Sequence, residues 1–434
     1  MFRRSFTFIN VTVLTAAGPI GHALRVTGSR IAAIDTPPQK RDVVIDGQGS
    51  LLIPGLINAH DHLELNTFQR IKYRERYSHS VQWIEDIEAR FDTNPELVEP
   101  RRQPLADRLL IGAVKNLLSG VTTVCHHNPL HRPLRYNYPI RVVKNYGFCH
   151  SLFRGDDPET SYHQTKANYP WIIHLAEGCD DAARQEFEQL DRAGLVQPNT
   201  VLVHGVGLTP SQRHGLIERG GGLVWCPGSN LFMLGETAQV GGLAEAGKLA
   251  LGSDSRLSGE GDLLAELRVA AATHQLSAAA LFRTVTLDAA RLLRIRQAGV
   301  GNLEVGGAAD LILLPSPGES SGVACSPPNP PKGGEPDLIP PFGGVGGPES
   351  ATDLNPPPRE DILFSAIHQQ TRATLNLVML AGNPLVGAES MQPVFDATNA
   401  ACQNVQVDGV SKLMHRKLVN RLRRMTIAEP GLTW

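Results

Sequence analysis

The sequence lacks the features that mark membrane, disulfide-rich or nucleic-acid-binding proteins. None of its 434 residues lies in a run of ~18 apolar residues, so no membrane-spanning helix is expected. The six cysteines are scattered without a CxxC pair, which argues against a disulfide framework and for a cytoplasmic protein with reduced thiols. The formal charge of −2 gives no electrostatic reason to expect nucleic acid or a membrane surface as partner.

A cleaved leader is not expected either. Residues 6–13 alternate with the two-residue period of a strand and form no continuous apolar stretch. Hydrophobic residues make up 41% of the chain and charged residues 19%, which is ordinary for a globular protein with a large core. The length suits an α/β barrel of about 250 residues with a small companion domain.

From Leu51 onward, short apolar runs alternate with longer amphipathic segments. This pattern is typical of βαβ units around a parallel sheet. Seven such runs lie between residues 51 and 254, which approaches the eight strands of a (β/α) barrel. Only about 18 residues separate the runs "GFCHSLF" and "WIIHLAE", too few for a full unit, so one strand is very short there or the barrel is distorted.

The expected fold class is therefore α/β, a distorted TIM-type (β/α)8 barrel with a small β-sandwich domain formed from both chain ends. Residues 1–50 supply the N-terminal part of that small domain, and residues 51–298 form the barrel. Residues 299–315 and 359–434 supply its C-terminal part and a terminal helix. Residues 316–358 hold 12 Pro and 8 Gly in 43 positions, the composition of a low-complexity insertion that cannot bury a core.

Two histidines, His60 and His62, follow the apolar run 51–59, which is expected to be the first barrel strand. Side chains at i and i+2 of a strand point to the same side, so both imidazoles can converge on one ion. Barrels place their active sites at this carboxyl end of the strands. Taken alone, the pair could equally be a loop that carries two histidines.

Three later apolar runs also end in a single candidate ligand, namely His174, His204 or Asp254. Each alone could be a hydrogen-bonded core or loop residue, but one shared site explains all of them together. Imidazole and carboxylate suit Zn²⁺, and Fe²⁺, Co²⁺ or Mn²⁺ fit the same ligand types. Glu177, three residues after His174, could serve as a general acid and base or could simply open the next helix.

Together these segments resemble the amidohydrolase superfamily, and within it the cytosine deaminase and atrazine chlorohydrolase group. The resemblance covers nearly the whole chain apart from the Pro/Gly-rich insertion. Its motifs here are "PGLINAHDH", "GVTTV", "IHLAEG", "LVHGVGL", "CPGSNLFMLG", "LGSDS" and "GGAADLILL".

The resemblance implies one divalent metal, with zinc as the first expectation. Its ligands would be His60, His62, His174 and Asp254. It implies that Glu177 moves protons between the attacking water and the substrate, and that His204 orients the water and the atom under attack. Asp254 would also accept a proton from the water. No lysine stands at a strand end where binuclear relatives carry a carboxylated lysine, so the mononuclear type is favoured.

Four further residues are candidate substrate contacts. Asn230 belongs to a segment expected over the pocket, and Glu64 follows the histidine pair. His126 and His127 are adjacent and point in different directions, so one of them is expected to face the pocket. The tryptophans Trp83 and Trp225 are expected to be packing residues.

The expected function is hydrolysis of a non-peptide carbon–nitrogen bond, most simply deamination of a nitrogen heterocycle by a metal-activated water. Alternatives with the same site are hydrolysis of a cyclic or linear amide and dechlorination of a ring. A non-catalytic barrel that serves as a binding module is a different class, and the complete ligand set with Glu177 speaks against it. The expected partner is a small-molecule substrate, and a homo-oligomer is compatible with the sequence.

Overall fold

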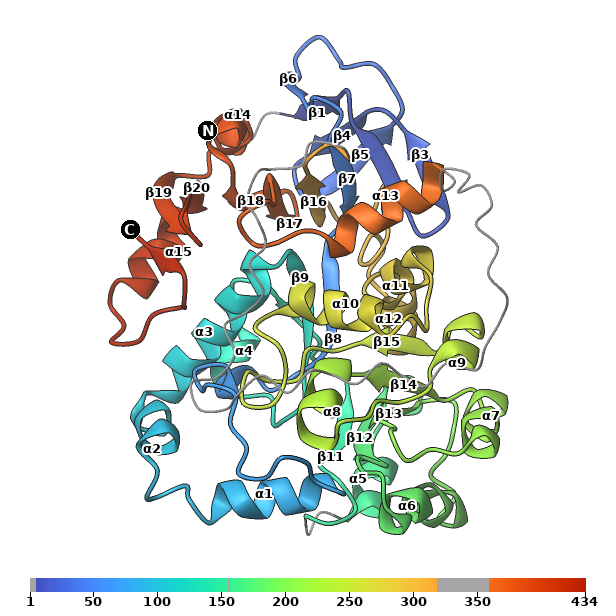
Figure 1. Ribbon diagram of the computed structural model, residues 1–434. Helices are drawn as coiled ribbons and strands as arrows, with labels where there is room; N and C mark the ends of the chain where they lie inside the picture. The colour runs from blue at the N-terminus through green and yellow to red at the C-terminus, as the bar shows by residue number, and fades with distance from the viewer. Residues whose placement is uncertain (1–4, 155–156, 318–358) are drawn as a thin grey trace, which may run out of the picture.

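A barrel and a β-sandwich lie end to end in the computed structural model, which describes residues 5–154, 157–317 and 359–434 (Figure 1). This confirms the predicted fold class. Of the predicted low-complexity insertion, residues 318–358 lie outside the described residues. Among the described helices, none has the length and apolar character needed to span a membrane.

The barrel contains eight short strands whose pairings are all parallel, in two groups. One group has the order β10-β9-β8, and the other runs in order from β11 to β15. Their interior side chains are mostly Val, Leu, Ile and Ala, which fill the barrel as a packed core. The strands are β8 (Leu56–Asp61), β9 (Val121–His126), β10 (Arg141–Val142), β11 (Gly147–Cys149), β12 (Trp171–Leu175), β13 (Thr200–His204), β14 (Gly222–Trp225) and β15 (Leu249–Leu251).

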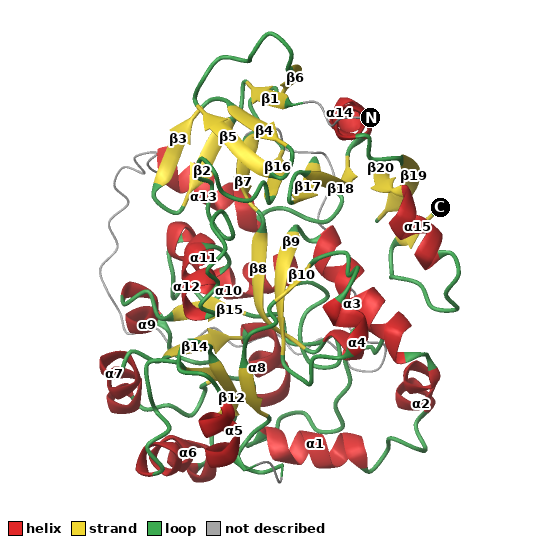
Figure 2. Ribbon diagram, turned by 180° about the vertical axis from the view of Figure 1, so that it is seen from behind, coloured by secondary structure: helices red, strands yellow, loops and turns green. Residues whose placement is uncertain are grey.

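Helices surround these strands and begin at residues suited to that position (Figure 2). Asp180 accepts a hydrogen bond from the backbone N–H of Ala183, and Thr209 forms a capping box with Gln212. The helices of this layer are η1 (Leu63–Leu65), α1 (Ser80–Glu88), α2 (Pro95–Arg102), α3 (Leu105–Leu118), α4 (Arg132–Arg135), α5 (Pro158–Gln164), α6 (Asp181–Arg192), α7 (Pro210–Glu218), α8 (Pro227–Leu234), α9 (Gly241–Glu245), α10 (Leu263–Ala272), α11 (Ala278–Thr284) and α12 (Leu287–Leu292).

The irregular barrel unit lies one strand earlier than the sequence predicted. The segment between β11 and β12, predicted to be too short for a full strand-plus-helix unit, contains the helix α5. The missing helix belongs instead to the preceding unit, because only residues 143–146 separate β10 from β11. β10 itself has two residues, and an ion pair between its Arg141 and Asp310 joins it to the sandwich side. So short a strand leaves no recognisable periodicity in the sequence.

The apolar run 51–59 is divided between the two parts of the protein, which corrects its prediction as a single barrel strand. β7 (Leu51–Pro54) pairs antiparallel with β16 (Leu311–Leu314) in the sandwich, and β8 begins the barrel. Gly55 separates them, and a Cβ atom there would lie 2.2 Å from Oγ1 of Thr122. Both halves are buried, so hydrophobicity alone gives no sign of the break. The domain boundaries given above remain a prediction.

The sandwich is built from two sheets. One has the order β5-β4-β1-β6 and the other the order β21-β19-β20-β18-β17-β16-β7-β2-β3, so strands from both chain ends share the larger sheet. Phe6, Phe8, Leu311 and Phe395 belong to its buried core. The remaining elements are β1 (Phe6–Ile9), β2 (Thr12–Thr15), β3 (Gly18–Gly21), β4 (Leu24–Thr27), β5 (Arg30–Ile34), β6 (Val43–Asp46), α13 (Arg359–His368), β17 (Leu377–Leu380), β18 (Asn383–Gly387), η2 (Glu389–Met391), α14 (Gln392–Thr398), β19 (Cys402–Val407), β20 (Val410–His415), α15 (Arg416–Leu422) and β21 (Leu432–Thr433).

A buried carboxylate near the C-terminus fastens this end of the chain to the barrel. The Glu429 side chain is fully buried and accepts from Arg256 Nη2 at 2.5 Å and from Arg372 Nη1 at 2.6 Å. Arg256 lies two residues after Asp254, so this ion pair anchors the loop that follows a candidate metal ligand.

We expect Glu429→Gln to lower the free energy of unfolding by about 3–5 kcal/mol, because it leaves the largely buried guanidinium group of Arg256 without its carboxylate, whereas Arg372 keeps Asp408. Urea denaturation monitored by circular dichroism measures this change. Glu245→Gln is the control, since Glu245 is exposed at the end of α9. Equal midpoints for the two variants would contradict the anchoring role.

Candidate metal centre and active site

Four predicted ligands meet at the carboxyl ends of the barrel strands. His60 is the second-last residue of β8, and His62 directly follows that strand. His174 lies in β12, and Asp254 lies three residues after β15. The two Nε2 atoms of His60 and His174 are 3.2 Å apart. Oδ1 of Asp254 lies 3.9 Å from His60 Nε2 and 3.7 Å from His62 Nε2. Adjacent ligands of a tetrahedral zinc ion are separated by about 3.3–3.6 Å. The ligating atoms of His60, His62 and Asp254 lie within 4.8 Å of one another, and His174 adjoins this group through His60.

The backbone is held in an unusual conformation at these strand ends. Ala176, His204 and Asp254 have φ values of 54°, 75° and 51°, which place non-glycine residues in the left-handed region. Such conformations cost on the order of 1–3 kcal/mol each and persist where the surrounding structure enforces them. Ala176 follows β12, His204 is the last residue of β13, and Asp254 lies three residues after β15, so the chain turns away from the extended conformation at each of these strand ends.

The protonation states of these groups suit a cation. Burial, followed by the neighbouring His127, holds the pKa of both His60 and His174 well below the ordinary value, so their rings are neutral. Neutral imidazole is the state that binds metal. Burial opposes ionisation of Asp254, but His62 and His204 outweigh it and lower the pKa of this carboxyl.

Asp254 is also oriented by two hydroxyl groups. Ser229 Oγ and Ser258 Oγ each donate to its Oδ2 at 2.7 Å, which leaves Oδ1 facing the histidines. Carboxylates that bind metal are commonly fixed through their second oxygen in this way. The donor set and its orientation therefore fit a divalent cation.

His127 contributes an imidazole that the sequence analysis placed only among substrate contacts. Its ring stacks on that of His174, with centroids 4.2 Å apart and an interplanar angle of 9°. Both ring nitrogens are buried, and the backbone of Cys149 lies beside the ring. His60, His127 and His174 also form a group whose ligating atoms lie within 4.8 Å of one another. The sequence signal was its place after the buried strand β9.

Glu177 and His204 form a pair beside the ligands. Oε1 of Glu177 is 3.3 Å from Nε2 of His204. Burial, strengthened by the nearby carboxylate of Asp254, raises the pKa of Glu177 well above its ordinary value and so favours its protonated form. Burial lowers the pKa of His204 to about 4, which keeps this ring neutral. Next to the candidate metal site, the pair thus combines a carboxyl group that favours its protonated form with a neutral imidazole.

A cavity of about 280 Å³ opens onto this group. Its inner end carries the ligand and proton-transfer side chains, and much of its outer wall is apolar. α1 supplies Trp83, Ile84 and Ile87 to that wall, although the sequence analysis treated Trp83 as a packing residue. The full lining is His62, Leu65, Ser80, Trp83, Ile84, Ile87, Glu88, Phe91, Asn128, His150, Arg154, His174, Glu177, His204, Met233, Asp254, Ser255, Leu257 and Ser258.

None of the four predicted substrate contacts (Asn230, His126, His127 and Glu64) is among the described residues that line this cavity. Asn230 lies behind it, where its Nδ2 contacts His204 Nδ1 at 3.0 Å. Glu64 accepts from Asn128 Nδ2, which also contacts His62 Nδ1 at 3.3 Å. These two residues therefore support the orientation of site histidines.

His126 lies on the far side of Glu64. Glu64, His126 and His131 form a group of possible metal-binding atoms, with Glu64 Oε2 at 3.7 Å from His126 Nδ1. The backbone N–H of Leu63 already donates to that nitrogen at 3.4 Å, so this group is a poorer cation site than the first.

Comparison with known proteins assigns the chain to a family. The family model of the amidohydrolase family matches residues 160–338. A 5-methylthioadenosine/S-adenosylhomocysteine deaminase of Nitratidesulfovibrio vulgaris is 31% identical, over 62% of this chain and 72% of the relative. The chain belongs to the amidohydrolase family. This confirms the resemblance seen in the motifs and makes the protein a hydrolase.

Other comparisons agree with that assignment. A 5'-deoxyadenosine deaminase of Methanothermobacter thermautotrophicus is 24% identical to this amidohydrolase, over 72% of this chain and 85% of the relative. Atrazine chlorohydrolase from Arthrobacter aurescens TC1, solved with zinc, superposes with a TM-score of 0.65 at 18% identity, over 91% of this chain and 99% of that one. An adenosine deaminase from Xanthomonas campestris with bound zinc gives 0.63 at 19% identity, over 98% and 99%. These two structures share the fold.

We expect His60→Ala to lose bound metal and activity together, because one of four ligands is removed. Metal content after reconstitution, measured by plasma mass spectrometry, checks the first part. His214→Ala is the matched control, since this histidine is exposed on α7 and should leave metal content unchanged. A fully metallated His60→Ala protein would contradict the ligand assignment.

Proposed function

We propose that this amidohydrolase removes an amino group from a nitrogen heterocycle, using one divalent cation bound by His60, His62, His174 and Asp254. Zinc is the proposed ion, in keeping with the ligand types and with the zinc in the two structurally similar proteins. The observation that carries the proposal is that His62, His174 and Asp254 line one cavity together with the Glu177–His204 pair. The fourth residue of the set, His60, places its Nε2 atom 3.2 Å from that of His174.

A bound divalent cation would supply Lewis acidity, lowering the pKa of a water molecule towards about 7. The side chains around it then divide the proton transfers. The water oxygen bonds to the carbon that carries the amino group, and one proton of that water passes to Asp254. Glu177 gives its stored proton to the adjacent ring nitrogen, while His204 holds the forming hydroxyl group.

The second half of the reaction returns the site to its starting state. The carbon–nitrogen bond breaks, and the amino group leaves as ammonia with the proton held by Asp254. Glu177 then recovers a proton from the new hydroxyl group, which becomes a carbonyl. Water and the amine are thereby converted to a carbonyl product and ammonia, and both carboxyl groups return to their initial protonation states.

The substrate class we propose is a purine nucleoside or a related heterocycle. The relatives named above deaminate adenosine derivatives, and the apolar wall formed by α1 would accept a ring or a thioether group. A small-molecule substrate and a cytoplasmic location are part of the same proposal.

The proposal is tested by an ammonia-release screen of zinc-loaded protein against 5'-methylthioadenosine, 5'-deoxyadenosine, S-adenosylhomocysteine, adenosine, cytosine and guanine. Ammonia release from at least one of them is expected. A chlorinated triazine is included because the atrazine chlorohydrolase shares the fold. Chloride release without any ammonia release would overturn deamination and favour dechlorination by the same site.

We expect Glu177→Gln to keep its metal and lose turnover by about 10²- to 10⁴-fold, because only the proton donor is removed. Steady-state rates and metal content are measured on the same preparation. Glu218→Gln, on the exposed surface of α7, should retain the full rate. Unchanged turnover in Glu177→Gln would disprove its role in proton transfer.

A further inference from the structure

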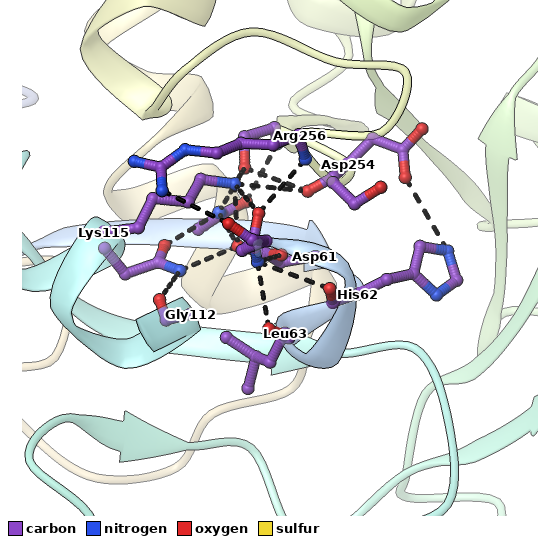
Figure 3. Close-up of polar contacts among 12 residues, drawn as sticks. Asp61, His62, Leu63, Gly112, Lys115, Asp254 and Arg256 are labelled. Carbon is purple, nitrogen blue, oxygen red and sulfur yellow. Dashed lines mark hydrogen bonds and ion pairs between the residues drawn. The ribbon is translucent and has the colours of Figure 1, made fainter. Parts of the chain in front are cut away.

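A buried polar cluster lies directly behind the candidate metal ligands (Figure 3). All of its members are at most 1% exposed, although each carries a polar or charged side chain. We call it the Lys115 cluster, and it consists of Asn58, Asp61, Asn66, Lys115, Asn116 and Ser253. Lysine is almost never fully buried unless it is paired, so a buried ammonium at this position needs a physical explanation.

The ammonium of Lys115 finds a partner for each of its three protons. It donates to Asn66 Oδ1 at 2.8 Å, to Ser253 Oγ at 3.0 Å and to Asp61 Oδ2 at 3.3 Å. The backbone carbonyl of Asp254 lies 3.5 Å away as a further acceptor. Lys115 lies in the last turn of α3, so one helix outside the barrel reaches two of its strand ends.

Asp61 explains why the ion pair forms here. It stands between His60 and His62, and alternation along the strand sends its side chain to the opposite side, towards α3. Its carboxylate accepts from Asn66 and Asn116 at 2.7 Å each and from Asn58 at 3.2 Å. The buried pair therefore has the additional hydrogen bonds that such pairs require in order to be favourable.

The cluster joins two segments that carry candidate ligands. β8, which leads to His60, and β15, which leads to Asp254, belong to different strand groups of the barrel. In β8, the Asn58 side chain donates from Nδ2 to Ser253 Oγ at 2.8 Å and accepts at Oδ1 from the backbone N–H of Ser253 at 3.0 Å. The backbone N–H of Asp254 donates to His60 O at 3.1 Å. Lys115 bonds to both segments at once.

We propose that Lys115 is a positioning residue of the metal centre. Its ammonium, paired with Asp61, sets the separation between the His60/His62 segment and Asp254 and so determines how well the four ligands fit one ion. The inference rests on the proposed ligand set. The alternative is that the pair stabilises the fold without affecting the geometry of the ligands.

Three variants separate these two roles. Lys115→Met removes the ammonium, Asp61→Asn removes the carboxylate, and the double variant removes both charges while retaining side chains of similar size. Each is compared for Co²⁺ affinity and visible absorption spectrum, and for the thermal midpoint of the metal-free protein. Lys412→Met is the matched control, because Lys412 is also buried, in β20 of the sandwich, where it donates to Leu375 O at 2.8 Å.

We expect Lys115→Met to weaken Co²⁺ binding by about 10- to 100-fold and to change the spectrum, whereas Lys412→Met leaves both unchanged. The double variant should recover the thermal midpoint lost by the single variants but not the Co²⁺ affinity. It also tests the proposal if Lys115→Met does not fold.

Wild-type Co²⁺ affinity and spectrum in Lys115→Met, or their recovery together with the thermal midpoint in the double variant, would overturn the positioning role. Failure of the wild-type protein to bind one Co²⁺ would instead remove the proposed ligand set, and this inference with it.

Discussion

The architecture of this amidohydrolase depends on bringing three imidazoles and a carboxylate together in a place without bulk water. Their carriers are far apart in the sequence, at residues 60, 62, 174 and 254, and only the parallel packing of barrel strands makes them neighbours. Burial keeps the rings of His60 and His174 neutral, and the surrounding histidines and hydroxyl groups keep Asp254 ionised. A buried group of neutral imidazole nitrogens and one carboxylate favours the binding of a cation.

The proton chemistry follows from the same burial. Within one small region, burial and the Asp254 carboxylate raise the pKa of Glu177, whereas His62, His204 and the hydroxyl groups of Ser258 and Ser229 lower the pKa of Asp254. Two carboxyl groups whose pKa values are driven apart can act as donor and acceptor in one reaction. Left-handed backbone at Ala176, His204 and Asp254 provides the turns that aim these groups at one another.

The barrel, the sandwich and the candidate metal ligands could be predicted from the sequence. Each candidate ligand lies at the end of an apolar run, and the carboxyl ends of the parallel strands lie at the same end of a barrel. Four features could not be predicted from the sequence, for physical reasons. The break at Gly55 lies between two buried strands of equal hydrophobicity, and β10 is too short to show a period. The contacts of Lys115 and the position of α1 beside the cavity arise from tertiary packing. No sequence motif in α3 or α1 indicates which residues these helices contact.

The most direct test of this account is the position of the ion in crystals of the zinc-loaded protein, located by anomalous scattering at the zinc edge. One peak is predicted, about 2.0–2.2 Å from Nε2 of His60, His62 and His174 and from a carboxylate oxygen of Asp254. No peak at this position, or a peak bound instead by Glu64, His126 and His131, would contradict the account.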